Sequence, residues 1–172
     1  MNEVNTIRNI QQQTSRLHLT HLDDRDATVP AVLKNVAECS WIHLACHGTQ
    51  DAVNPTDSAF NLTDDQLTLK EIIKQSFSHT ELAFLSACQT AMGDSELPEE
   101  AIHLAASMLI ARYGSVVATM WSIQDNDAPI VAEKFYEHLI KDAGGDSGRA
   151  AYALHKAVAH LAEVRGEDKV MR

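Results

Sequence analysis

The sequence has no cluster of basic residues and no long uninterrupted hydrophobic run. The formal net charge of −10 argues against nucleic acid or an anionic membrane surface as a partner, since both need concentrated Lys and Arg. The most apolar stretch, residues 101–121, is interrupted by His103, Arg112 and Gly114, and therefore lacks the roughly 18 apolar residues of a membrane span. We expect neither nucleic acid nor a membrane as a partner.

Cysteine is also scarce, and the first residues carry no charged start followed by an apolar core. Cys39, Cys46 and Cys88 form an odd set without the spacing of a disulfide framework, which suits free thiols in a reducing compartment. The sequence therefore predicts a cytoplasmic protein without a secretory signal.

Hydrophobic periodicity predicts strands that alternate with helices. Helical spacing covers residues 27–38, 67–77, 99–113, 127–143 and 149–164, whereas strand patterns cover residues 17–22, 40–46, 82–87 and 115–121. Residues 49–65 are rich in Asp, Asn, Thr and Pro and are predicted to form a loop. Thr68 and Glu71 have the spacing of a capping box, and Gly114 is expected to end the helix before it. This order predicts an α/β fold with a right-handed, mostly parallel sheet.

Two of these strands stop at residues that can carry out acid–base or nucleophilic chemistry. Residues 42–48 (IHLACHG) reach His47, and residues 82–90 (LAFLSACQT) reach Cys88. Because open α/β sheets place ligands beyond the carboxyl ends of their strands, we expect His47 and Cys88 to meet at one edge. An imidazole beside a thiol is the minimum constellation for nucleophilic catalysis by cysteine.

The chemistry of the pair assigns a role to each residue. A free thiol with a pKa of about 8.5 is only a few per cent thiolate at neutral pH, so Cys88 needs a base, and the His47 imidazole can accept its proton. The backbone N–H groups of Gly48 and Cys88 could form an oxyanion hole. The alternative is that Cys88 is a small buried hydrophobic residue, as many intracellular cysteines are.

The motifs resemble those of a known family. They are His47-Gly48, residues 85–90 (LSACQT), residues 100–105 (EAIHLA) and residues 117–125 (VATMWSIQD), and together they are similar to the CHAT domain. CHAT domains belong with the caspases, separases and gingipains and are commonly fused behind tetratricopeptide repeats. The resemblance implies a caspase-like fold, His47 as general base, Cys88 as nucleophile, Gly48 and Cys88 as oxyanion donors, and peptide-bond hydrolysis without a cofactor.

The same resemblance predicts a three-layer α/β/α sandwich that is incomplete. Too few residues precede the His47 strand to supply the first central strand of a caspase-like sheet, and the closing strand is also expected to be missing. Unpaired backbone groups would then remain in the sheet centre, which favours a fragment of a longer protein. The predicted organisation is a helix/strand remnant over residues 1–26, a CHAT-like domain over residues 27–165 and a disordered tail over residues 166–172.

The sequence gives weaker evidence for a substrate pocket or a metal site than for the His47/Cys88 pair. Ser86, Asp125 and Asp51 are candidate lining residues of a substrate pocket, where an acid would favour Lys or Arg. Asp125 is equally compatible with a turn in which it binds its own backbone. Strand alternation sets Cys46 on the face opposite His43 and His47, so these residues and Cys39 are not expected to bind a metal.

The sequence therefore predicts a cysteine endopeptidase with a His47/Cys88 dyad and a protein or peptide substrate. Tetratricopeptide-repeat regions are candidate partners. The alternatives are a catalytically inert interaction or scaffold module and a truncated fragment.

Overall fold

A computed structural model describes residues 3–14, 17–49, 51, 53–75, 79–86, 88–89, 99–119, 124 and 126–166. For residues 55, 88–89 and 99–103 it describes the backbone alone. The contacts divide the chain into two compact units, of which one comprises Met1–His21 with Ile123–Arg172 and the other Leu22–Ser122. This division differs from the predicted boundaries at residues 26, 27 and 165, which stay predictions. The predicted tail over residues 166–172 lies, apart from Gly166, outside the described residues.

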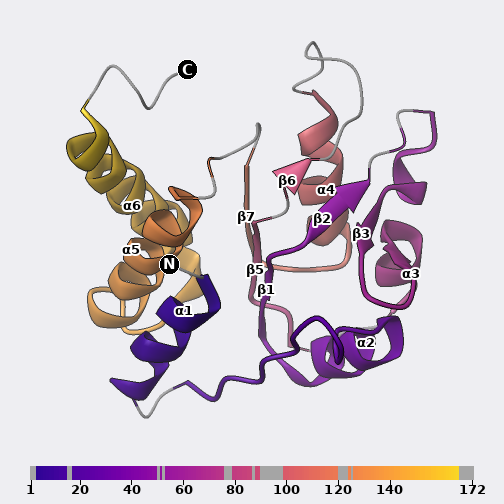
Figure 1. Cartoon of the computed structure of the whole chain (residues 1–172), viewed down its shortest axis with the longest axis horizontal. Coiled ribbons are helices and arrows are strands. Elements are labelled where there is room, and N and C mark those ends of the chain that lie inside the picture. The colour runs from indigo at the N-terminus through magenta and orange to yellow at the C-terminus, as the bar shows by residue number, and fades with distance from the viewer. Residues whose placement is uncertain are drawn as a thin grey trace. The chain divides into compact units, whose positions relative to one another are not determined.

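The unit Leu22–Ser122 contains a parallel three-stranded sheet in the order β1-β5-β7 (Figure 1). The strands are β1 Trp41–Leu44, β5 Leu82–Leu85 and β7 Ser115–Ala118. Each of the two pairs, β1 with β5 and β5 with β7, runs parallel over four residues. The prediction of parallel strands separated by helices is confirmed for these three segments.

A second, four-stranded sheet has the order β4-β3-β2-β6. Its strands are β2 His47–Thr49, β3 Ala59–Asn61, β4 Gln66–Thr68 and β6 Cys88–Gln89. Strand β3 pairs antiparallel with β2 and β4, whereas β2 and β6 are parallel. The sheet also corrects the predicted loop over residues 49–65, which contains β3 and the short helix η1 Pro55–Asp57. Three-residue strands are too short to produce a recognisable period.

The described residues of this unit also form three α-helices: α2 Val29–Glu38, α3 Leu69–Lys74 and α4 Glu99–Ile110. Thr28 caps α2, and the predicted capping box of Thr68 and Glu71 is present at α3. The end of α4 differs from the prediction, because Arg112 and not Gly114 adopts a positive φ, of 72°. The N–H of Tyr113 then reaches back to the carbonyl of Met108 at 3.1 Å, as in a Schellman motif.

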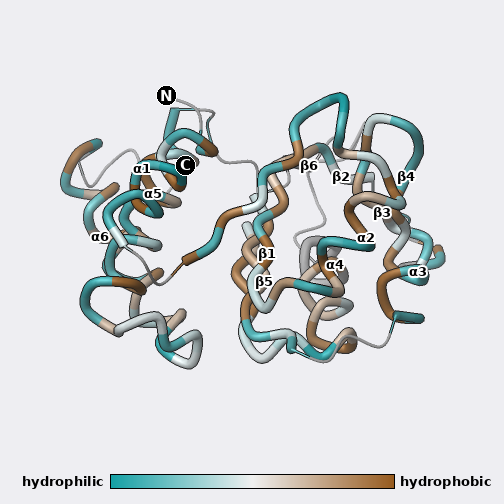
Figure 2. Tube along the Cα trace, turned by 90° about the horizontal axis from the view of Figure 1, so that it is seen from below, coloured by the Kyte–Doolittle hydropathy of each residue, from teal (hydrophilic) through white to brown (hydrophobic). Residues whose placement is uncertain are grey.

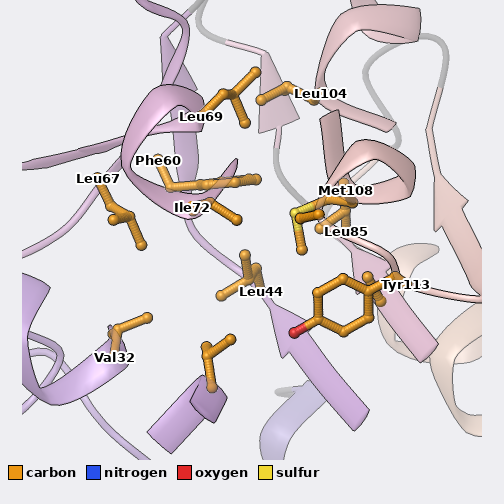
Figure 3. Close-up of a cluster of buried hydrophobic side chains, with 13 residues drawn as sticks. Val32, Leu44, Phe60, Leu67, Leu69, Ile72, Leu85, Leu104, Met108 and Tyr113 are labelled. Atoms are coloured by element: carbon orange, nitrogen blue, oxygen red, sulfur yellow. The ribbon is translucent and has the colours of Figure 1, made fainter. Parts of the chain in front are cut away.

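A hydrophobic core joins the helices to both sheets. Phe60 and Leu67 from the small sheet, and Ala83 and Leu85 from β5, belong to one buried cluster. Figure 3 shows Phe60 among Leu67, Leu69 and Ile72, with Met108 and Leu104 of α4 nearby. Because this cluster covers one face of the small sheet, the polar residues of β2, β3 and β4 occupy the opposite face.

The other unit consists of α1 Glu3–Gln12, α5 Ala128–Lys141, η2 Ser147–Arg149 and α6 Ala150–Arg165. Helix α5 contacts both α1 and α6. Hydrophilic and hydrophobic segments follow each other along these helices in Figure 2, as in amphipathic helices. No described helix is both long enough and apolar enough to cross a membrane.

The predicted strand over residues 17–22 is wrong. None of these residues is in a strand, and Leu19 is exposed. An alternation of apolar and polar residues predicts a strand only where a neighbour offers backbone partners and a core offers burial. Residues 17–22 pair with no strand among the described residues.

Candidate active site

The two predicted strands that lead to the site end earlier than expected. Strand β1 ends at Leu44 and β5 at Leu85, and the N–H of Ser86 donates to the carbonyl of Leu44 at 2.9 Å. The chain bends at Cys46 and then enters the small sheet at His47. His47 and Cys88 therefore lie in short strands of their own, β2 and β6, rather than at the ends of long ones.

The register of the small sheet brings the two expected catalytic residues together. Strands β2 and β6 are parallel neighbours, and His47 is the direct partner of Cys88. Residues in register on neighbouring strands share a face of the sheet, about 4.8 Å apart between strand axes. His47 is exposed, so its side chain is accessible to a substrate. The described residues make no hydrogen bond or ion pair with the His47 ring.

Gly48 lies in the middle of the small sheet. It is buried, and its partners are Phe60 on β3 and Gln89 on β6. A residue without a Cβ allows a close approach of another group to its backbone. The role of Gly48 as an oxyanion donor stays a prediction.

The three expected pocket residues have different positions. Ser86 is buried directly after β5. The carboxylate of Asp51 accepts hydrogen bonds from the N–H groups of Val53 at 2.9 Å and Asn54 at 2.8 Å. Asp51 thus stabilises the loop after β2, a structural use of its charge. Asp125 lies outside the described residues. The substrate roles of all three stay predictions.

Two residues of the group considered above for metal binding, Cys46 and His43, have apolar surroundings. Cys46 packs against the hydrophobic core, where burial raises the pKa of its thiol to about 11. His43 stacks on Phe84, with ring centroids 4.8 Å apart, and burial lowers the pKa of His43 to about 4. Both groups are therefore neutral at pH 7. Within the described residues no group of three or more His, Cys, Asp or Glu side chains could hold a metal ion.

Sequence reasoning missed a polar network beside His47. Thr49 Oγ1 donates to Asn61 Oδ1 at 2.9 Å, and Gln66 Nε2 donates to the same Oδ1 at 3.0 Å and to Thr49 Oγ1 at 3.3 Å. Residues 63–65 (TDD) favour a turn and residues 66–68 (QLT) alternate, but residues 59–61 (AFN) show no alternation, so the sequence held only a weak signal for this network. Residues 59–61 and 66–68 form the β3–β4 hairpin.

The comparison with curated proteins gives no match. The model of the CHAT domain, in contrast, matches residues 2–169, which is nearly the whole chain. The parallel sheet with its helices is consistent with part of a caspase-like α/β sandwich. On this evidence the chain belongs to the CHAT domain family, a caspase-like family.

Proposed function

We propose that this protein is a cysteine endopeptidase in which His47 is the general base and Cys88 the nucleophile. One observation carries the proposal: the parallel pairing of β2 with β6 makes His47 and Cys88 direct partners. Membership of a caspase-like family supports the same reaction class. A peptide or protein is the corresponding substrate.

The two residues divide the reaction between them. The imidazole of His47 takes the thiol proton, and the Cys88 thiolate attacks the carbonyl carbon of the scissile bond. The resulting tetrahedral intermediate collapses, the C–N bond breaks, and the imidazolium gives its proton to the leaving amine. A water molecule, deprotonated by His47, then hydrolyses the thioester and releases the carboxylic acid with a free Cys88 thiol.

The proposal assigns the developing negative charge to the N–H groups of Gly48 and Cys88. One such donor is worth about 3 kcal/mol in the transition state. Gly48 adjoins the base along β2, and its neighbour Gln89 adjoins the nucleophile along β6. Ser86, Asp51 and Asp125 are the proposed contacts for the residue before the scissile bond, although Asp51 already binds two backbone amides.

The first experiment measures the reactivity of each cysteine with iodoacetamide from pH 5 to pH 8, using mass spectrometry to quantify each site. Cys88 should react at pH 6 much faster than an ordinary thiol, which is only about 0.3% thiolate there. Cys46 is an internal reference, because burial raises the pKa of its thiol to about 11.

Single-residue variants test whether the reactivity of the Cys88 thiol depends on His47. His47→Ala should lower the rate of Cys88 at pH 6 at least tenfold, whereas His79→Ala, which removes an exposed histidine of the same unit, should not. A peptidyl acyloxymethyl ketone should label the wild-type chain and not Cys88→Ala. Equal rates in His47→Ala and wild type, or equal labelling of Cys88→Ala, would exclude the peptidase and leave a binding role.

A further inference from the structure

The strand order of the small sheet sets four chemically distinct residues side by side across its strands. Cys88 pairs with His47, and Asn61 pairs with Gln66. Gly48 is opposite Phe60 and Thr49 is opposite Ala59, so one further step of this antiparallel register sets His47 opposite Asn61. The strand order β4-β3-β2-β6 therefore arranges the row as Gln66, Asn61, His47 and Cys88.

The exposure of the residues agrees with a common outer face. His47, Thr49 and Gln66 are exposed and Asn61 is half-buried. Their neighbours along the strands, Phe60 and Leu67, point into the core instead. The row is thus open to a ligand that reaches His47.

Among the described residues, the hydrogen bonds of the Asn61 side chain involve its oxygen and not its nitrogen. Its Oδ1 accepts from both Thr49 and Gln66, which occupies the two lone pairs of that oxygen. Asn61 therefore has no side-chain acceptor left for a ring N–H of His47, which argues against a third catalytic member. Its Nδ2 retains two N–H donors, for which the described part of the chain shows no partner.

Gln66 complements this arrangement. Its Nε2 donates to Asn61 and Thr49, while its Oε1 accepts no hydrogen bond from any described residue. The network thus presents a donor on Asn61 and an acceptor on Gln66, both held in place by side-chain hydrogen bonds. A donor and an acceptor side by side match the C=O and N–H of a peptide unit, or the carboxamide of Asn or Gln.

The position relative to the dyad decides which part of a substrate would reach the network. In the proposed mechanism His47 protonates the leaving amine, so the segment after the scissile bond begins beside His47 and can extend from there over Asn61 and Gln66. Asn61 is one strand beyond His47 and Gln66 two strands beyond, or about 5 and 10 Å. At about 3.3 Å per extended residue, these distances correspond to the first three residues after the scissile bond.

We propose that Thr49, Asn61 and Gln66 form a subsite for the leaving-group side of the substrate, which selects polar, hydrogen-bonding residues there. This inference rests on the proposed peptidase function. It assigns specificity to the β3–β4 hairpin, whereas the pocket proposed above concerns the residue before the bond.

The test compares cleavage of a proteome-derived peptide library by wild type, Asn61→Ala, Gln66→Ala and Lys34→Ala. Lys34 is an exposed residue of α2, a helix that packs against the same core as Phe60 and Leu67, and is the matched control. Wild type and Lys34→Ala should prefer Asn, Gln, Ser or Thr within three residues after the bond. Asn61→Ala and Gln66→Ala should lose this preference and keep the profile before the bond.

Kinetics provide a second readout. For the best peptide from the library, kcat/KM should fall about tenfold in Asn61→Ala, as expected for one hydrogen bond. The corresponding 7-amino-4-methylcoumarin amide has no residue after the bond, and its kcat/KM should change less than twofold. The proposal is wrong if Asn61→Ala lowers kcat/KM equally for both substrates, or if the residue preference after the scissile bond does not change. Thr49, Asn61 and Gln66 would then be ordinary solvated residues of the sheet.

A titration that needs no catalysis separates this inference from the peptidase proposal. In Cys88→Ala, the capped peptide Gly-Gln-Gly should shift the side-chain amide NMR signals of Asn61 and Gln66, and Asn61→Ala should abolish the shift at Gln66. If these signals do not move at 10 mM peptide, there is no subsite, whatever the reactivity of Cys88. If they move while Cys88 is unreactive, the network binds a peptide amide, but the peptidase proposal fails and with it the assignment to the leaving-group side.

Discussion

At the scale of single residues, two histidines only four positions apart have opposite surroundings. His43 stacks on Phe84 and its Nε2 atom is buried, whereas His47 is exposed. The bend at Cys46 separates them, because it ends the first sheet and starts the second. Burial favours the neutral imidazole, so His43 is a structural residue and His47 is the one accessible to a substrate.

The buried His43 predicts a stability that depends on pH. Its folded-state pKa of about 4 lies below the ordinary value of 6.5, so the unfolded chain binds a proton between these values that the folded chain does not. Stability should be complete above pH 6.5 and fall as the pH decreases towards 4, by at most about 3 kcal/mol. Urea unfolding at pH 4.5 and pH 7.5 measures this difference.

The variant His43→Phe keeps an aromatic ring against Phe84 and removes the titrating group. It should show a smaller loss of stability at pH 4.5 than wild type. His155→Gln changes an exposed histidine of α6 and should behave as wild type. The same pH dependence in His43→Phe and wild type would show that another group is responsible.

At the scale of elements, the start of α3 follows the sequence closely. Thr68 Oγ1 accepts from the N–H of Glu71, while the Glu71 carboxylate accepts from the N–H of Thr68 at 2.9 Å. The Thr68 hydroxyl also donates to the Glu71 carboxylate at 2.7 Å, and this bond together with the one from the Thr68 N–H lowers the pKa of Glu71. Because Thr68 ends β4 as well, the cap connects the hairpin that carries Gln66 to the helix that covers its inner face.

Thr68→Ala should destabilise the protein by about 1 kcal/mol, because it leaves an amide at the start of α3 without its partner. Glu71→Ala should cost a similar amount, and the double variant less than the sum, since both changes disrupt one box. Chemical denaturation of the four chains gives the coupling energy. Strictly additive effects would mean that the two hydrogen bonds stabilise α3 independently.

The β-strands illustrate where periodicity is insufficient. The long apolar patterns over residues 40–46 and 82–87 predicted β1 and β5 correctly but not the second sheet that follows them. That sheet depends on the pairing of β2 with β3 and with β6, which lies far from β2 in the sequence. Since strand pairing is a tertiary interaction, residues 59–61 carry too little local information to predict it.

At the scale of the whole molecule, the two ends of the chain belong to one compact unit. Helix α1, from the N-terminal segment, contacts α5, which also contacts α6. Ile10 is buried on α1, and Phe135 and Leu139 are fully buried on α5. The stability of α5 should therefore depend on residues more than a hundred positions away in the sequence.

Ile10→Ala should destabilise this unit by about 2–4 kcal/mol, because it removes a large buried side chain. Hydrogen exchange should show weaker protection in α5 and α6, with unchanged protection in β5. The exposed Asn9 is the matched control, and Asn9→Ala should leave all protection factors unchanged. Equal loss of protection in β5 and α5 would mean that the two units unfold together.

The sequence by itself determined which segments become the parallel strands and most helices, because each has an apolar period of its own and several have a cap. It also singled out His47 and Cys88 as the residues that follow the two most apolar strands. Only the tertiary structure decided that these residues are direct partners in a separate sheet and that Asn61 and Gln66 extend their row. The reason is physical: helix periodicity and capping are local properties, whereas the register between short strands depends on backbone hydrogen bonds and burial contributed by distant parts of the chain.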